Sequence, residues 1–372
     1  MSTEALITAR NLKKYFPIKT GVFRKVTGYV KAVDGVSFSI ARGETMGLVG
    51  ESGCGKSTTG RVLLRLLEAT EGAVTFGGRD VFGADKHELR GMRPRMQFIF
   101  QDPFSSLNPR LPVNEIVGEA MLQHKIAANR AEMNDKVVEV IGKCGLFPDQ
   151  ARRYPHQFSG GQRQRVCIAR ALAVNPEFIV CDEAVSALDV SIQSQIINLL
   201  KDLQDEMGLT YLFISHDLSI VRFISDSVGV MYLGQIVEYG SKAQIFENAL
   251  HPYTEALLSA APSLGVSLPP LGASPSPGTV SPLGASPSPG VASASGVAVS
   301  SGAALSPSAL ARRAKKRVIL EGDIPSPANP PPGCRFHTRC PYAKDMCGEL
   351  APDNAELAPG HFVMCHKAQG KF

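Results

Sequence analysis

The chain has 372 residues, of which 44% are hydrophobic and 20% are charged, and its formal net charge is +5. This length exceeds the usual single-domain size, so we expect one large core with an appended module. This modest net charge does not indicate a nucleic-acid-binding protein. The N-terminus lacks the apolar stretch of a signal peptide and no run of about 18 apolar residues follows, so we expect a protein that is neither secreted nor membrane-spanning by itself.

Residues 1–262 alternate strand-like and helix-like patterns. Short apolar runs at 45–50, 178–182 and 211–215 predict buried strands of a largely parallel sheet. Residues 190–208 have helical spacing and end at a glycine, where a C-cap is expected. This alternation predicts an α/β fold with helices on both faces of the sheet. The stretch from about 103 to 175 is richer in helix and predicts a helical subdomain.

A glycine-rich loop follows the first of these predicted strands. The sequence GESGCGKST matches G-x-x-x-x-G-K-[ST] between a buried strand and a helix, which is the context that a P-loop requires. Its backbone N–H groups and the helix N-terminus would face phosphate oxygens, Lys56 would reach the β- and γ-phosphates, and Ser57 would bind Mg²⁺. The predicted ATP-binding residues are Gly50, Glu51, Ser52, Gly53, Cys54, Gly55, Lys56, Ser57 and Thr58.

An acidic pair supports a nucleotide site. Asp182 ends the apolar run FIVCD, at the strand tip where open α/β sheets bind ligands, and would hold Mg²⁺. Glu183 follows directly and is placed to orient or deprotonate the attacking water. The alternative, two acidic residues that only cap the next helix, is weakened by the P-loop upstream. We therefore predict binding and hydrolysis of a nucleoside triphosphate.

A second anion-binding helix start occurs at FSGGQRQRVCIARAL. The chain already has one phosphate-binding loop, so this second anion-binding segment is expected to complete the ATP site of another protomer. Two ATP molecules would then be bound between two protomers. With these motifs the sequence resembles the ABC ATPase family, of which SGGQ is the signature. The residues that would close over the partner's ATP are Ser159, Gly160, Gly161 and Gln162.

The resemblance implies further site residues. Gln101 matches the Q-loop, which contacts Mg²⁺ and the attacking water and senses the transmembrane partner, and His216 matches the switch histidine at the γ-phosphate. Ser186 and Asp189 lie in the D-loop of the dimer interface. An N-terminal aromatic should stack on adenine, with Phe16 as the first choice and Tyr15 as the second.

The resemblance also narrows the class. Each motif occurs once and the cassette is compact, which favours a transporter subunit over a soluble ABC ATPase. The stretches FQDPFSSLNPR, CDEAVSALDVSIQSQI and HPYTEALLSAAP resemble the ATP-binding subunits of oligopeptide and dipeptide importers, in particular the F-type subunit. This implies a second ATP-binding subunit (a paralogue or a second copy), two permease subunits and an extracytoplasmic peptide-binding protein, at the cytoplasmic face of the cell membrane. Related importers carry nickel or glutathione, so the cargo stays open.

A change of composition marks residues 263–314. Residues 263–311 contain no charged, histidine or aromatic residue, and PLGASPSPG occurs twice. Such a segment cannot bury enough apolar surface to fold, so we predict a disordered linker. The run ARRAKKR at 311–317 carries five positive charges and is interpreted as a solvated linker end.

The final module, residues 315–372, contains four of the eight cysteines, spaced C-x5-C-x6-C-x17-C. Disulfides are not expected in a reducing compartment, and structural zinc usually takes C-x2-4-C pairs. The spacing suits an iron–sulfur cluster, which the family resemblance implies as [4Fe-4S], while zinc or four ordinary buried thiols stay open. The predicted ligands are Cys334, Cys340, Cys347 and Cys365, with His337, His361 and His366 nearby in sequence.

Overall fold

The computed structural model describes residues 4–260, 320 and 322–372. The described residues belong to one compact unit, so the C-terminal segment folds together with the first 260 residues. The predicted linker at 263–314 and the basic run at 311–317 lie outside the described residues.

The central sheet has eight strands in the order β11-β12-β10-β9-β3-β8-β7-β6. Five neighbouring strands, from β9 to β6, run parallel, and β10, β12 and β11 continue the sheet in antiparallel pairing. Their bounds are β3 Thr45–Val49, β6 Met96–Ile99, β7 Phe178–Asp182, β8 Thr210–Ile214, β9 Ser227–Tyr232, β10 Gln235–Ser241, β11 Ala355–Ala358 and β12 His361–Val363. The three predicted strands are therefore confirmed as β3, β7 and β8.

The helices of the first 260 residues are α1 Lys56–Leu63, α2 Lys86–Met92, α3 Pro103–Ser106, α4 Val113–Gln123, α5 Arg130–Lys143, α6 Gly160–Leu172, α7 Val190–Met207, α8 Leu218–Ile224, α9 Lys242–Glu247 and α10 Pro252–Ala260, and α12 Asp345–Glu349 follows in the C-terminal segment. Helix α7 confirms the predicted helix at 190–208, since Gly208 takes the left-handed conformation at its C-cap with φ 66°.

Both faces of the parallel strands are buried, which explains their continuous apolar runs. Alternate residues of β7 enter different cores. Val180 belongs to the core that contains α1, whereas Cys181 belongs to the core that contains α6 and α7. The parallel strands are therefore covered on two sides, as the sequence predicted.

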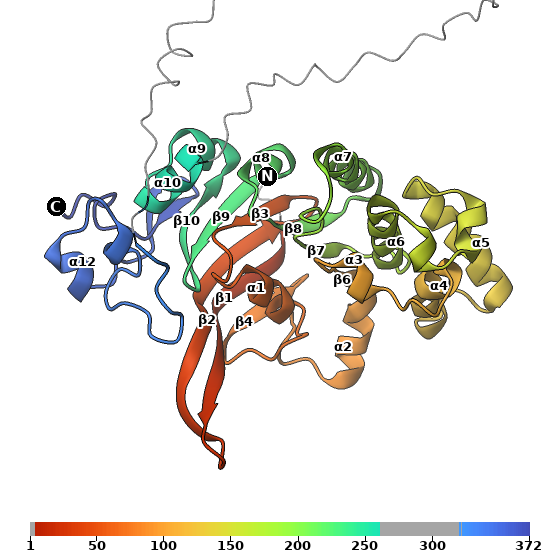
Figure 1. The fold of residues 1–372 in the computed structure, drawn as a ribbon, viewed down its shortest axis with the longest axis horizontal. Helices are drawn as coiled ribbons and strands as arrows, with labels where there is room; N and C mark the ends of the chain where they lie inside the picture. Colours follow the sequence, from red (N-terminus) through yellow and green to blue (C-terminus); the bar gives the residue numbers. More distant parts are fainter. Residues whose placement is uncertain (1–3, 261–319, 321) are drawn as a thin grey trace, which may run out of the picture. The chain divides into compact units, whose positions relative to one another are not determined.

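A second sheet was not predicted. It is antiparallel, in the order β2-β1-β4-β5, with bounds β1 Ala5–Thr20, β2 Lys25–Ala41, β4 Glu71–Phe76 and β5 Arg79–Asp80. Strands β1, β2 and β4 and helix α1 share one core with β7 and β8. Figure 1 shows this sheet next to α1. Helices thus lie on both faces as predicted, and on one face this unpredicted sheet helps α1 to cover the parallel strands.

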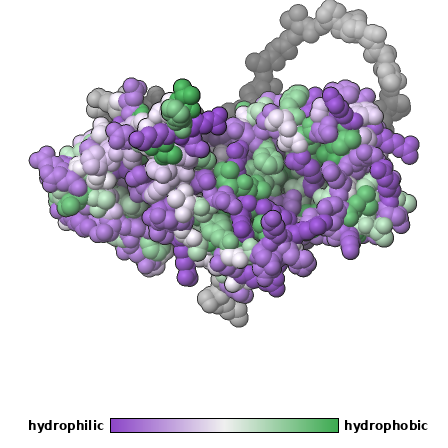
Figure 2. Space-filling model, turned by 90° about the horizontal axis from the view of Figure 1, so that it is seen from below, coloured by the Kyte–Doolittle hydropathy of each residue, from purple (hydrophilic) through white to green (hydrophobic). Residues whose placement is uncertain are grey.

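The last segment, blue in Figure 1, lies beside β10. Strand β12 pairs with β10, which matches Glu238 with Val363 and Tyr239 with Phe362. The face in Figure 2 is mostly hydrophilic, with hydrophobic side chains in small patches. Among residues 4–260 and 322–372, no helix is long and apolar enough to cross a bilayer.

Candidate functional site

The glycine-rich loop connects β3 to α1, and its glycines are required by its shape. Gly50 has φ 152° and Gly55 has φ 110°, conformations that side chains rarely adopt. A Cβ at Gly55 would lie 2.0 Å from the carbonyl oxygen of Ala32. The buried Lys56 donates from Nζ to the carbonyl oxygens of Gly50, at 2.8 Å, and Glu51, at 3.0 Å. The other predicted residues of this site, Ser52, Gly53, Cys54, Ser57 and Thr58, lie on the same loop and the first turn of α1.

Ser57 and Asp182 lie together at the end of this loop. The Ser57 hydroxyl donates to Oδ1 of Asp182 at 2.6 Å. Burial raises the pKa of Asp182, although the hydrogen bond from Ser57 opposes the shift. A hydroxyl beside a buried strand-end carboxylate is a donor set of oxygen atoms, the kind that Mg²⁺ prefers. The residues present therefore fit a magnesium ion.

Three more predicted residues meet beside this pair. The Gln101 side chain donates from Nε2 to Oε2 of Glu183 at 2.7 Å, and Nδ1 of His216 lies 3.6 Å from Oε1 of the same carboxylate. Glu183 has φ 47°, and its backbone N–H donates to the carbonyl of Ile214 at 3.0 Å. Residues far apart in sequence thus converge on one carboxylate at the carboxyl ends of β6, β7 and β8.

The SGGQ segment begins helix α6. Ser159 and Gln162 form a capping box, in which the Ser159 N–H donates to Oε1 of Gln162 at 3.0 Å and the Gln162 N–H donates to the Ser159 hydroxyl at 3.4 Å. A Cβ at Gly161 would lie 2.5 Å from Cγ2 of Ile192, so this glycine lets α6 approach α7 closely. Gly160 follows Ser159 and lies in the first turn of α6. In the described part of the chain, no hydrogen bond joins this segment to the glycine-rich loop.

The predicted D-loop residues support neighbouring structure. The Ser186 hydroxyl donates to the carbonyl oxygen of Glu183 at 3.0 Å, so it helps to fix the strained acidic residue. Asp189 is the N-cap of α7, where its side chain accepts from the N–H of Ile192 at 3.0 Å.

The two aromatic candidates for adenine lie next to each other on β1. The Tyr15 hydroxyl donates to Oδ1 of Asp34 at 2.5 Å, so this side chain already has a polar partner. The Phe16 ring is 36% exposed, with Nζ of Lys14 at 5.1 Å from its centroid. Phe16 is therefore the more exposed of the two candidates.

The four C-terminal cysteines, Cys334, Cys340, Cys347 and Cys365, line one small cavity together with His337 and His366. Burial and then the nearby thiols raise the pKa of Cys334 to about 11. Among the described residues, no group of three or more His, Cys, Asp or Glu side chains is arranged as a metal site. The thiols are gathered around one space without a metal-ligating arrangement.

The histidines near these thiols have separate roles. His361 lies apart from the cavity, with Nε2 at 2.8 Å from the buried carboxylate of Glu238. His366 uses Nε2 at the carbonyl of Leu350, whereas its buried Nδ1 has no partner among the described residues. His251 also lines the cavity, and it was not predicted there because it lies in the predicted ATPase domain. The cavity is thus lined by four thiols and by a histidine whose Nδ1 has no partner among the described residues.

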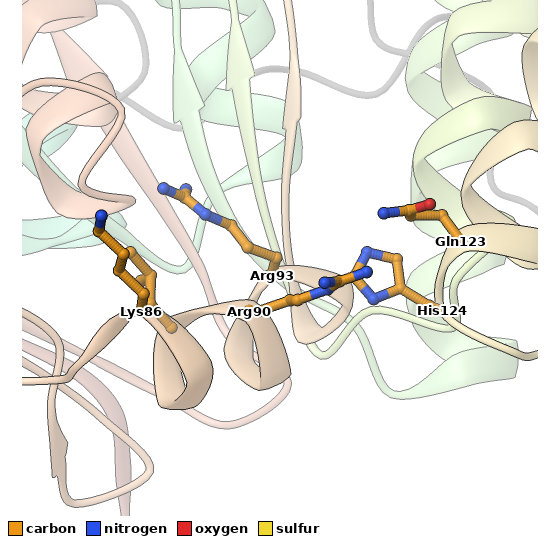
Figure 3. A pocket seen from close by; sticks show the side chains of 6 residues that line it. Lys86, Arg90, Arg93, Gln123 and His124 are labelled. Carbon is orange, nitrogen blue, oxygen red and sulfur yellow. The ribbon is translucent and has the colours of Figure 1, made fainter.

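A basic cavity of about 290 Å³ was not predicted. Its lining side chains come from α2 and the turn after it and from the end of α4, as Figure 3 shows. They are Lys86, Leu89, Arg90, Arg93, Gln123 and His124. The basic residues come from α2 and the turn after it. Nothing in the sequence indicates that they will meet Gln123 and His124 at the end of α4.

The glycine-rich loop, its buried lysine and the Ser57–Asp182 pair form an arrangement that is typical of P-loop nucleoside triphosphatases. Residues 33–186 match the ABC transporter family, and residues 237–284 and 304–347 match the oligopeptide/dipeptide transporter C-terminal region. The oligopeptide transport ATP-binding protein AppF of Bacillus subtilis is 50% identical over 98% of this chain and 97% of its own length.

Solved structures agree with this assignment. The ATP-binding cassette MJ0796, solved as a dimer bound to ADP and Pi, is 30% identical with a TM-score of 0.57, covering 63% of this chain and 98% of its own. The fold is also shared with cbiO1 from Clostridium perfringens, at 24% identity and a TM-score of 0.56, over 66% of this chain and 93% of its own. The chain therefore belongs to the ABC transporter family, as an ATPase of the oligopeptide/dipeptide transporter group.

Proposed function

We propose that this protein binds and hydrolyses ATP to power the import of dipeptides or oligopeptides through a membrane ABC transporter. The observation that carries the proposal is the convergence of Gln101 and His216 on the Glu183 carboxylate, beside the Ser57–Asp182 pair. The match of the C-terminal region and the name of the relative AppF support the peptide cargo.

Each residue at the site has a role in this proposal. Lys56 binds the β- and γ-phosphates, and Phe16 stacks on adenine. Ser57, Asp182 and Gln101 would hold Mg²⁺, which supplies positive charge against the phosphate oxygens. Glu183 orients and deprotonates the attacking water, and His216 contacts the γ-phosphate. The bond from Gln101 to Glu183 keeps the carboxylate in a fixed orientation.

Two subunits would act together. Ser159, Gly160, Gly161 and Gln162 close over the ATP of a second ATP-binding subunit, where the N-terminus of α6 offers backbone N–H groups to phosphate. Ser186 and Asp189 then lie at the interface between the two subunits. Because Ser159 and Gln162 cap each other in the single chain, closure exchanges these bonds for bonds to phosphate.

The partners follow from this role. Two permease subunits form the pore and an extracytoplasmic binding protein delivers the peptide, so the ATPase works at the cytoplasmic face of the cell membrane without a nucleic-acid partner. We place the docking site of a permease loop at the basic cavity. Helix α2, which lines this cavity, is followed by β6 and then by Gln101, so docking there could reach the ATP site. An acidic loop segment would complement Lys86, Arg90 and Arg93.

The test is ATP hydrolysis by the complex that co-purifies with this subunit. Peptide-loaded binding protein should stimulate phosphate release, whereas nickel or glutathione should not. Stimulation by nickel or glutathione alone would assign the subunit to another importer of this group. A subunit that hydrolyses ATP without any membrane partner would favour a soluble ABC ATPase.

We also propose that Cys334, Cys340, Cys347 and Cys365 hold a [4Fe-4S] cluster, with zinc as the competing metal. The support is that the four thiols line one cavity. A cluster would join four positions of a segment that has little secondary structure of its own, through one iron–thiolate bond at each cysteine. Anaerobic protein should contain about four irons with matching sulfide, and Cys334→Ser should lower both metal content and complex assembly. Zinc, or no metal at all, would contradict this proposal.

A further inference from the structure

We propose that two arginines of the C-terminal segment, Arg335 and Arg339, are positioning residues that hold the ATP site in its binding shape. We call the pair the arginine brace. It lies on the short stretch between Cys334 and Cys340, and it contacts supports of both the phosphate end and the adenine end of the site. The inference rests on the nucleotide site proposed above and assigns that site two residues outside the P-loop ATPase motifs.

The contact at the phosphate end is a bidentate ion pair. Nη1 of Arg339 lies 2.8 Å from Oε2 of Glu51, and Nη2 lies 3.1 Å from Oε1. The Arg339 side chain is only 7% exposed and that of Glu51 is 24% exposed, so water screens the pair weakly. Paired parallel hydrogen bonds of this kind fix orientation as well as distance. The second residue of the glycine-rich loop is therefore fixed by a residue 288 positions away.

Glu51 is also held through its backbone. Its N–H donates to the Tyr253 hydroxyl at 3.0 Å, and its carbonyl oxygen accepts from Nζ of Lys56 at 3.0 Å. The carbonyl that receives the loop lysine thus belongs to the residue that Arg339 holds. Movement of Glu51 would shift both the loop backbone and the lysine that is to bind phosphate.

The contact at the adenine end uses the other arginine. Nη2 of Arg335 is hydrogen-bonded to Oδ2 of Asp34, and Nη1 to the carbonyl of Leu233. The other oxygen of the Asp34 carboxylate accepts from the Tyr15 hydroxyl. Tyr15 precedes Phe16, so Arg335 supports the strand that presents the ring proposed to stack on adenine.

The residues around the two arginines keep them in place. The Phe336 ring is 1% exposed, and its centroid lies 5.3 Å from those of both Tyr232 and Tyr253. The N–H of Cys334 donates to the carbonyl of Cys347 at 2.8 Å. These contacts anchor the stretch that carries the two arginines beside Asp34 and Glu51. The C-terminal segment thus contacts supports at both ends of the proposed ATP site.

If the two arginines only attached the C-terminal segment to the rest of the fold, their replacement would lower the stability of the protein without a specific effect on ATP binding. The brace predicts a nucleotide effect that depends on Glu51. The experiment is an equilibrium titration of the full chain with ATP and Mg²⁺, in Arg339→Met, Glu51→Gln and the double variant. Thermal unfolding checks the fold of each variant. Lys371→Met is the matched control, since it breaks an ion pair with Asp353 in the same segment away from the loop.

Arg339→Met should weaken ATP binding about tenfold, which corresponds to about 1.4 kcal/mol. The double variant should bind no more weakly than the worse single variant, because both changes remove the same pair. In the assembled complex, KM for ATP should rise more than kcat falls, since Arg339 touches no reacting atom. Lys371→Met should bind as the wild type does.

Wild-type affinity in Arg339→Met, or fully additive losses in the double variant, would overturn the brace. If Arg339→Met does not fold, Arg339→Lys keeps the charge but not the two-point geometry, and it must still weaken ATP binding to support the inference. Failure of the wild type and of Lys371→Met to bind ATP would overturn the nucleotide site itself, and the brace with it.

Discussion

Replacement of Glu183 by glutamine tests the chemistry of the site. The carboxylate accepts from Gln101 at 2.7 Å and lies 3.6 Å from Nδ1 of His216. Glutamine has the same shape and keeps one oxygen for the Gln101 bond, so the loop that binds phosphate is unchanged. The basic oxygen is lost, and a positioned general base contributes about 10²–10⁴-fold to rate. The barrier should therefore rise by about 3–5 kcal/mol.

The assay is phosphate release by the assembled complex, with ATP affinity measured in parallel. Glu183→Gln should bind ATP within about threefold of the wild type and lose at least about a hundredfold in turnover. Glu177→Gln is the control, because Glu177 precedes the same strand β7 and pairs with Arg95 and Arg42 instead of the site. Steady turnover near the wild-type rate in Glu183→Gln would refute the role given to this carboxylate.

Three further predictions concern the supports of the site. Glu238→Leu removes the acceptor of two backbone N–H groups and of His361, so urea unfolding should show that the free energy of unfolding falls by about 3–5 kcal/mol. Glu238→Gln should lower it much less, and equal losses in the two variants would be contrary to this reasoning. Burial opposes the ionisation of Asp34, but hydrogen bonding and the charge of Arg335 lower its pKa. Its stabilisation is complete above the unfolded pKa of about 3.9 and is lost as pH falls through the lower folded value. The difference in unfolding free energy between wild type and Asp34→Asn should therefore be constant above about pH 4 and shrink progressively below it, and a constant difference down to about pH 2 would contradict the assignment. Gly55→Ala would place a Cβ 2.0 Å from a backbone carbonyl oxygen and should abolish ATP binding in a calorimetric titration, whereas retained affinity would mean that the loop adapts.

Local patterns in the sequence were sufficient for much of the parallel sheet and its loops. The run at 178–182 is apolar throughout because both faces of β7 are buried, and a glycine with positive φ ends α7 where the sequence predicts a C-cap. The family resemblance indicated Gln101 and His216, and the apolar run before Asp182 indicated Glu183. These residues follow β6, β8 and β7, which are neighbours in the sheet.

Other features had no local signal. Strands β1 and β2 pair over many residues, but register shifts interrupt their alternation and hide the antiparallel sheet from a periodicity argument. Strands β11 and β12 have four and three residues, which is too short for a pattern. The pair formed by Arg339 and Glu51 joins residues 288 positions apart, and only the folded chain brings them together.

ATP hydrolysis at this site is proposed to drive peptide import. The measurement that tests this directly is uptake of a labelled peptide mixture into proteoliposomes that contain the co-purified complex. The binding protein is added on the side of the membrane from which peptide is taken up. We predict accumulation of peptide that requires ATP at the opposite face and is abolished by Glu183→Gln. ATP hydrolysis by the same vesicles without peptide uptake, or with uptake of nickel or glutathione instead, would contradict the account.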